Sequence, residues 1–215
     1  KQSSYLIEIT SSILNTQKDG AYLIDKIKPV ANHKGTGKLT VETGLNYGFP
    51  LPSIFEAFNA RVESNYQKIW PTTTKNIKIE LNPIELQEAI YFSRLSTLTQ
   101  GILFIEYFSK RENLEIKIED VMQNWLEGCI IRSDLLKEIK SILKDGPPNK
   151  SIVESEQIQI NLNSRIKNTK NLLSHCIENN IPTPVMYSSL NWYINSSSGF
   201  NPSSLIQAQR DYFGA

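Results

Sequence analysis

The chain has 215 residues, of which 40% are hydrophobic, and its 23 basic and 22 acidic side chains leave a formal net charge of +1. This size allows one large domain or two small ones, with a substantial buried core. The near balance of charge excludes a protein-wide basic field of the kind that attracts nucleic acid or an anionic membrane surface, so we expect neither partner.

Two cysteines, Cys129 and Cys176, lie in apolar or helical patterns without a Cys-x-x-Cys spacing. They are too few for a disulfide framework, so we expect both to be buried free thiols in a reducing compartment. No run approaches the length of a membrane span, and residues 1–5 lack the apolar core of a signal peptide. We therefore expect a cytoplasmic protein. No cluster of His, Cys, Asp and Glu has metal-ligand spacing, so no metal site is expected.

The beginning of the chain predicts a helix, a turn and a second helix. Apolar residues at helical spacing predict the first helix over residues 4–14, and the polar run 18–20 ends it. The second predicted helix covers residues 39–47.

A glycine-rich segment, Lys-Gly-Thr-Gly-Lys at residues 34–38, comes directly before this second helix. Its glycines allow backbone N–H groups to approach a ligand, and its lysines and hydroxyl suit a phosphate or carboxylate. The N-terminal end of a helix also favours an anion. The spacing matches neither a P-loop, because Leu39 follows Lys38, nor a dinucleotide fingerprint, because Thr40 replaces the third glycine. The segment is either an anion site or a solvated turn with two surface lysines.

A third helix is predicted over residues 52–69. At 100° per residue, Arg61 falls on the same face as the apolar residues Ile54, Ala57 and Phe58. An arginine directed at an apolar face is costly unless its head reaches solvent or meets an anion. Both outcomes are open for Arg61.

The middle of the chain predicts a central helix. Residues 68–82 are polar and predict a surface excursion, and Pro83 then begins a pattern that continues to Arg111. Its apolar residues cover nearly every direction around the helix axis, which is typical of a buried helix. Gly101 costs about 1 kcal/mol of helix propensity in its middle, which indicates that another element crosses closely there.

The second half of the chain predicts further helices over residues 118–126 and 129–143, and helical spacing continues from 152 to 177. Another helix follows Pro184. No convincing strand is found. We therefore predict an all-α fold, a large helical domain built around the long buried central helix.

A C-terminal tail follows the predicted domain of residues 1–194 and covers residues 195–215. It begins with a flexible turn at 195–199 and ends in a short amphipathic helix over 202–213. Such a tail either covers the core of its own chain or reaches into a neighbouring subunit.

Several motifs together resemble the C-terminal half of the 6-phosphogluconate dehydrogenase family. They are the glycine-rich segment, Phe58-Asn59-Ala60-Arg61, Thr99-Gln100-Gly101, Gly128-Cys129-Ile130-Ile131-Arg132, and the closing run from Leu205 to Ala215. Their order and approximate spacing fit across nearly the whole chain, and the closing run is the most specific. Residues 68–82 and 144–163 match the family poorly.

The resemblance implies an oxidative decarboxylase of the pentose phosphate pathway, which converts 6-phosphogluconate to ribulose 5-phosphate and carbon dioxide while reducing NADP. It implies that Lys34, Thr36 and Arg61 bind the substrate phosphate. It also implies that Arg210 completes this site from the other subunit of a homodimer with exchanged C-terminal tails. The phosphate would then be the anion that Arg61 lacks.

The family's dinucleotide-binding domain and its catalytic lysine and glutamate lie upstream of the matching region. The resemblance therefore implies that this chain holds no catalytic residue, that NADP is bound mainly elsewhere, and that the isolated piece is inactive. His33 and Leu39 stand where the family more often has Gln or Asn and Trp, and the chain ends at Ala215 before a substrate-binding histidine of the family. Two alternatives remain open: a non-catalytic helical interaction module, and a related β-hydroxyacid dehydrogenase acting on a smaller acid.

Overall fold

The computed structural model describes residues 3–66, 79–146, 150–200 and 202–214. Within these ranges the regular elements are helices, apart from one short antiparallel strand pair and an isolated bridge between Ser4 and Ser133, so the predicted all-α fold is confirmed. None of the helices described has the length and apolar character needed to cross a membrane. Most of the predicted surface excursion lies outside the described residues. The elements follow the order α1 (Tyr5–Asn15), β1 (Gln17–Lys18), β2 (Ala21–Tyr22), η1 (Leu23–Lys26), α2 (Thr36–Asn46), α3 (Pro52–Glu63), η2 (Ser64–Tyr66), α4 (Pro83–Arg111), α5 (Ile118–Leu126), α6 (Asp134–Lys144), η3 (Ile152–Glu154), α7 (Glu156–Asn163), α8 (Ile166–Glu178), α9 (Pro184–Ser197) and α10 (Ser203–Tyr212).

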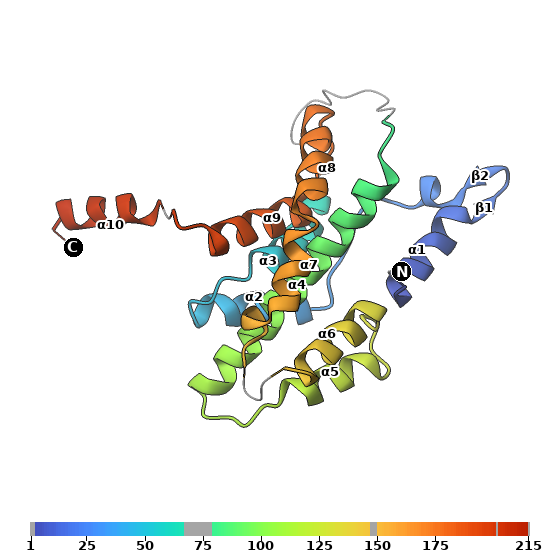
Figure 1. The fold of residues 1–215 in the computed structure, drawn as a ribbon. Coiled ribbons are helices and arrows are strands. Elements are labelled where there is room, and N and C mark those ends of the chain that lie inside the picture. Colours follow the sequence, from blue (N-terminus) through green and yellow to red (C-terminus); the bar gives the residue numbers. More distant parts are fainter. Residues whose placement is uncertain (1–2, 67–78, 147–149, 201, 215) are drawn as a thin grey trace.

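Helix α4 runs through the middle of the molecule, as predicted, and packs against α8 and α9 (Figure 1). It begins where the Asn82 side chain accepts a hydrogen bond from the Ile84 amide, with Pro83 in the first turn. Phe92, Leu95 and Ile102 of this helix are fully buried in the main core. The core continues into α6, α7, α8 and α9 through Leu136, Ile139, Ile158, Leu162, Leu173, Leu190 and Tyr193.

The element that passes α4 at Gly101 is α3. A Cβ built on Gly101 would lie 4.0 Å from Cδ1 of Ile54, which is ordinary contact. The preceding residue, Gln100, is fully buried and accepts a hydrogen bond from the Ser53 amide at the start of α3. An element therefore passes α4 at this point, as predicted, but at a distance at which a side chain would also fit, so the crossing does not require glycine. The bond to Gln100 fixes the first turn of α3, the helix that carries Arg61.

Several predicted boundaries differ from the structure, and helix α2 begins at Thr36 rather than at residue 39. Helix α3 ends at Glu63 and passes into the 3-10 turn η2, because the side chains of Ser64 and Asn65 bond to carbonyls of the last helical turn. Helix α6 begins at Asp134 rather than 129, since the Ser133 hydroxyl caps it. Helix α9 continues to Ser197, so the predicted turn at 195–199 is largely helical.

Two smaller expectations also change. The turn expected after α1 is present at Asp19 and Gly20, but it joins two strands that were not expected, β1 and β2, which pair through Gln17 with Tyr22 and Lys18 with Ala21. Both cysteines are free, but Cys176 is buried whereas Cys129 is only partly buried, so burial was predicted correctly for Cys176 alone.

Candidate functional site

The glycine-rich segment, residues 34–38, forms the N-terminal end of α2, as predicted. Gly35 is the N-cap residue and adopts φ +99°, a left-handed conformation that favours glycine. The first intrahelical bond of α2 runs from the Leu39 amide to the Gly35 carbonyl at 2.9 Å. The amides of Thr36, Gly37 and Lys38 precede it, so they lie in the part of the helix whose N–H groups lack intrahelical acceptors. This end of α2 can therefore donate backbone hydrogen bonds to an anion.

The two lysines of the segment have different environments. Lys38 lies 3.2 Å from Glu42 one turn later, an exposed pair that contributes little to stability. Lys34 is exposed and has no acidic partner among the described residues. Thr36 is also exposed. Of the two ammonium groups, Lys34 is therefore the one available to an incoming anion.

Arg61 lies beside the run that leads into this segment. Its Nη2 donates to the carbonyl of Asn32, two residues before Lys34. The amide of Ala31 donates to the Ser64 hydroxyl at 2.9 Å. The ring of His33 packs edge-on against a ring of α3, that of Phe58, with centroids 5.1 Å apart. Residues 31–33 are thus attached to the C-terminal end of α3, which brings Arg61 close to the glycine-rich segment.

The predicted apolar surroundings of Arg61 were wrong. Arg61 and Ala57 are exposed, and Ser53 is the buried residue of α3, a helix that packs mainly on α9. The helix turns its small polar side chain inward because Gln100 supplies hydrogen bonds there. Arg61 therefore needs no anion to compensate for burial. Its guanidinium has five N–H donors, and the described residues give it one acceptor, so donors remain for a ligand.

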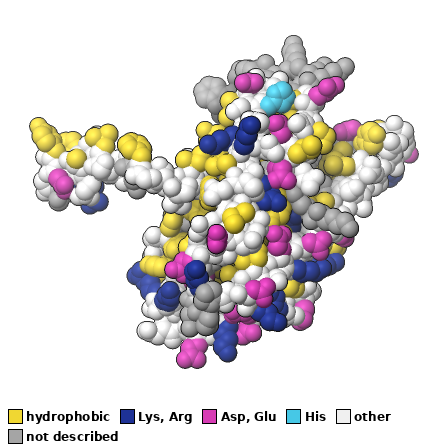
Figure 2. All heavy atoms as spheres, in the orientation of Figure 1, with side chains coloured by type: hydrophobic (Ala, Val, Ile, Leu, Met, Phe, Trp, Pro, Cys, Tyr) yellow, Lys and Arg dark blue, Asp and Glu magenta, His cyan; other side chains and the backbone are white. Residues whose placement is uncertain are grey.

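Arg210 is not brought to this site by its own chain. It is exposed on α10, which extends away from the body of the molecule and has no buried residue (Figure 1). The space-filling view shows hydrophobic side chains uncovered along this helix (Figure 2). The four large apolar residues of the tail helix and its end are 60–88% exposed: Leu205, Ile206, Tyr212 and Phe213.

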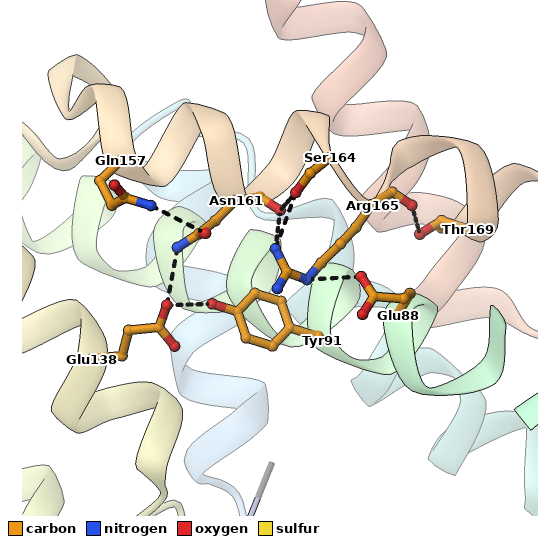
Figure 3. Close-up of polar contacts among 8 residues, drawn as sticks. All are labelled: Glu88, Tyr91, Glu138, Gln157, Asn161, Ser164, Arg165 and Thr169. Atoms are coloured by element: carbon orange, nitrogen blue, oxygen red, sulfur yellow. Dashed lines mark hydrogen bonds and ion pairs between the residues drawn. The ribbon is translucent and has the colours of Figure 1, made fainter. Parts of the chain in front are cut away.

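A partly buried polar network elsewhere in the molecule also contains charged side chains (Figure 3). Arg165 pairs with Glu88 at 2.9 Å, and its guanidinium carbon lies 3.9 Å from the ring centre of Tyr91. The Tyr91 hydroxyl donates to Glu138 at 2.7 Å. Burial, together with this bond to Glu138, raises the pKa of Tyr91 well above its usual range. Asn161 also donates to Glu138, at 3.0 Å. The network links α4, α6, α7 and the start of α8. Its polar groups form hydrogen bonds and an ion pair with one another, so we assign it a structural role.

Sequence reasoning missed the two positions that join the site together, the Asn32 carbonyl and the Ser64 hydroxyl. They contact residues 29 and 33 positions away in the sequence. A backbone carbonyl carries no sequence signal, and a serine at the end of a helix is common. Only the folded structure reveals these contacts. The described residues contain no cluster of three His, Cys, Asp or Glu side chains that could hold a metal ion.

Comparisons with known proteins agree with the sequence motifs. The whole chain, residues 1–215, matches the family model described as "6-phosphogluconate dehydrogenase, C-terminal domain". A relative from Synechocystis sp., named "6-phosphogluconate dehydrogenase, decarboxylating", is 33% identical over 99% of this chain and 46% of its own length. A relative of the same name from Lactococcus lactis subsp. lactis is 32% identical over 99% of this chain and 47% of its own length.

The structure is similar to a solved one from Plasmodium falciparum. The TM-score is 0.86 with 29% sequence identity, over 98% of this chain and 48% of the other. That protein is a 6-phosphogluconate dehydrogenase, studied in its apo form, with its cofactor NADP+ and with its substrate 6-phosphogluconate. The chain spans about half the length of the relatives it matches.

Proposed function

Because this chain belongs to the 6-phosphogluconate dehydrogenase family, we propose that it is the C-terminal helical part of a decarboxylating 6-phosphogluconate dehydrogenase. The complete enzyme would oxidise 6-phosphogluconate to ribulose 5-phosphate and carbon dioxide while reducing NADP. In this proposal the chain supplies a phosphate-binding site and the dimer contacts. The chemical steps belong to residues outside it.

The phosphate site consists of Lys34, Thr36 and Arg61, with Arg210 from a second subunit. The observation that carries this assignment is the hydrogen bond from Arg61 to the Asn32 carbonyl, which holds a guanidinium beside the segment that begins at Lys34. The N-terminal amides of α2 add further donors. A guanidinium, an ammonium group and helix amides suit a phosphate dianion in both charge and hydrogen bonding. A smaller hydroxy acid without phosphate would leave this set of donors unused.

NADP would be bound mainly by the upstream half of the enzyme. In the described part of the chain the paired strands are β1 and β2, of two residues each, so those residues form no parallel sheet of the dinucleotide-binding kind. We therefore assign no cofactor contact and no step of hydride transfer to this chain.

An uncovered apolar surface along α1 supports the proposal that a further part of the protein packs here. This helix has no buried residue, and its Leu6 and Leu14 are 43% and 53% exposed. A cavity of about 450 Å³ separates it from α4 and α9 and is lined by apolar groups that include Leu6, Ile90 and Met186. Apolar surfaces of this kind commonly mark a contact with another domain or chain.

A cytoplasmic location for the protein remains a prediction, supported by its free thiols.

The exposed α10 supports a homodimer with exchanged C-terminal tails. An isolated helix of ten residues is not stable in water, so α10 needs a surface to cover its apolar side. At 100° per residue, Leu205, Ile206, Tyr212 and Phe213 share one side of it, and Arg210 lies at the edge of that side. When the apolar side docks on a second subunit, Arg210 would be at the rim of the contact, where it could reach a phosphate.

Subunit mixing tests the tail exchange. Homodimers of full-length Arg210→Ala, and homodimers inactivated in the upstream half, should both be poorly active. Heterodimers of the two should recover activity, because one site receives an intact tail from the partner and an intact upstream half of its own. A mixture without any recovery would indicate that each tail serves its own chain.

Kinetics of the full-length enzyme test the phosphate site. For Arg61→Ala we expect the KM for 6-phosphogluconate to rise about 10- to 150-fold, as for a lost hydrogen bond to a charged group, with kcat changed much less. Arg111→Ala is the control, since Arg111 is exposed, donates to the Tyr107 hydroxyl and lies over the rings of Tyr107 and Tyr47, at the opposite end of α2 from the glycine-rich segment. An unchanged KM for Arg61→Ala would remove Arg61 from the site. A full-length protein that binds no 6-phosphogluconate and reduces no NADP would instead favour the non-catalytic module.

A further inference from the structure

We propose that Ser64 is a positioning residue for phosphate binding, because its hydroxyl fastens the run leading to Lys34 onto the helix that carries Arg61. This inference rests on the proposed phosphate site. It assigns a role to a residue that contacts no substrate itself.

The Ser64 hydroxyl makes two hydrogen bonds at once. It donates to the Arg61 carbonyl at 2.7 Å, and it accepts from the Ala31 amide at 2.9 Å. A hydroxyl has one proton and two lone pairs, so the bonds do not compete. One side chain thus connects the backbone of Arg61 with a segment that lies 33 residues from Ser64 in the sequence.

The helix to which this segment is attached is itself held firmly. Near its beginning, Ser53 is fully buried, and both its amide and its hydroxyl bond to the side chain of Gln100 in α4. Ser64 follows directly after the last residue of the same helix. The Ser64 hydroxyl therefore holds Ala31 at a fixed position relative to α3. Lys34 follows Ala31 three residues later.

The other hydrogen bond across this junction can be lost on ligand binding. It uses Nη2 of Arg61, and a guanidinium that turns toward a phosphate can release the Asn32 carbonyl. The Ser64 bonds use only its own hydroxyl and backbone atoms, so they are compatible with a bound ligand. In the ligand-bound state they would hold the spacing between Lys34 and Arg61. Such positioning must be accurate to about 0.5 Å for several donors to reach one anion.

Removal of the hydroxyl should weaken binding more than it weakens the fold. Ala31 is exposed, so water can satisfy its amide in Ser64→Ala. The Arg61 carbonyl keeps a hydrogen bond from the Asn65 side chain, at 3.2 Å. In Ser64→Ala the distance between the cationic groups of Lys34 and Arg61 is then no longer fixed before the substrate binds. We therefore expect a lower affinity for the substrate.

The test uses the full-length enzyme and three variants, Ser64→Ala, Ser64→Thr and Ser188→Ala. Ser188 is the matched control, because its hydroxyl also donates to a carbonyl three residues earlier, that of Val185, at 3.1 Å, and makes no hydrogen bond to another segment among the described residues. For Ser64→Ala we expect the KM for 6-phosphogluconate to rise about three- to tenfold, with kcat within about twofold of the parent. Ser64→Thr should restore the KM, and Ser188→Ala should leave it unchanged.

Inorganic phosphate and gluconate separate positioning from a general structural effect. Inhibition by inorganic phosphate should weaken in Ser64→Ala by the same factor as substrate binding, whereas the inhibition constant of gluconate, which lacks the phosphate, should not change. An unchanged KM in Ser64→Ala, a Thr variant as impaired as the Ala variant, or an equal loss for gluconate would overturn the inference. If Arg61→Ala raises the KM while Ser64→Ala does not, the positioning role alone fails. If Arg61→Ala also leaves the KM unchanged, the phosphate site itself is wrong.

Discussion

Replacement of Gln100 by leucine should loosen α3 specifically. Gln100 is fully buried, accepts from the Ser53 amide at 3.0 Å and donates to the Ser53 hydroxyl at 2.8 Å. The Ser189 hydroxyl donates to the Val185 carbonyl at 2.7 Å, so the 2.9 Å contact between the two serines is donated by Ser53. These bonds form one directed chain from α4 through α3 to α9. Leucine keeps the volume of Gln100 but leaves the Ser53 amide buried without an acceptor.

The cost follows from these bonds. Two hydrogen bonds contribute about 1 kcal/mol each, and an unsatisfied buried amide adds about 1–3 kcal/mol. Burial of the leucine methyl groups returns part of this, roughly 1 kcal/mol. We therefore expect the opening of α3 to become easier by about 2–4 kcal/mol, which corresponds to a rise of at least about 30-fold in the amide exchange rates of the helix.

Native-state hydrogen exchange of the full-length protein measures this change. Gln159→Leu is the control, because Gln159 is exposed and, among the described residues, its side chain bonds only to the Val153 carbonyl, at 2.8 Å. Its α3 amides should exchange at the parent rate. Equal protection of α3 in both variants would refute the reasoning that Gln100 holds this helix in place.

Two further changes probe packing and titration. Gly44→Val should destabilise the protein by about 1–3 kcal/mol in thermal unfolding. Even a Cβ at Gly44 would lie 2.8 Å from Cδ1 of the buried Leu51 and 3.4 Å from the Phe49 carbonyl oxygen. An unchanged Tm would mean that the α2–α3 junction adapts freely. Tyr91 has a folded-state pKa raised by burial and by its bond to Glu138, so the folded state retains its proton more tightly than the unfolded state. Its stabilising effect is complete below the ordinary tyrosine pKa of about 10 and decreases as the pH rises above it. Alkaline unfolding should therefore be less steep in Tyr91→Phe, and identical pH profiles for variant and parent would contradict this assignment.

The helices could be predicted where their signals are local. The limits of α4 and α5 agree with the sequence prediction, because Pro83 and the apolar spacing of each helix act within a few residues. The end of α3 could not be predicted from periodicity, since the Ser64 and Asn65 side chains compete for the carbonyls that a longer helix would use.

The candidate site also has one part that could be predicted from the sequence and one part that could not. The glycine-rich segment at the start of α2 could be read directly, because glycine and lysine at a helix N-terminus have a local physical meaning. The surroundings of Arg61 were predicted wrongly from angles around α3, because the position of a helix face depends on which neighbours pack against it. The assignment of Arg61 and Arg210 to a phosphate came from resemblance and stays a proposal.

The sequence by itself determined an all-helical fold, its central helix and a glycine-rich helix N-terminus, because capping, periodicity and glycine conformation act between near neighbours in the chain. The tertiary structure alone decided that Arg61 lies beside the residues before Lys34 and that Ser64 joins the two segments. These contacts span 29 and 33 residues. They exist only because α3 is fixed by Gln100 and by its packing on α9, and no pattern within either segment specifies that arrangement.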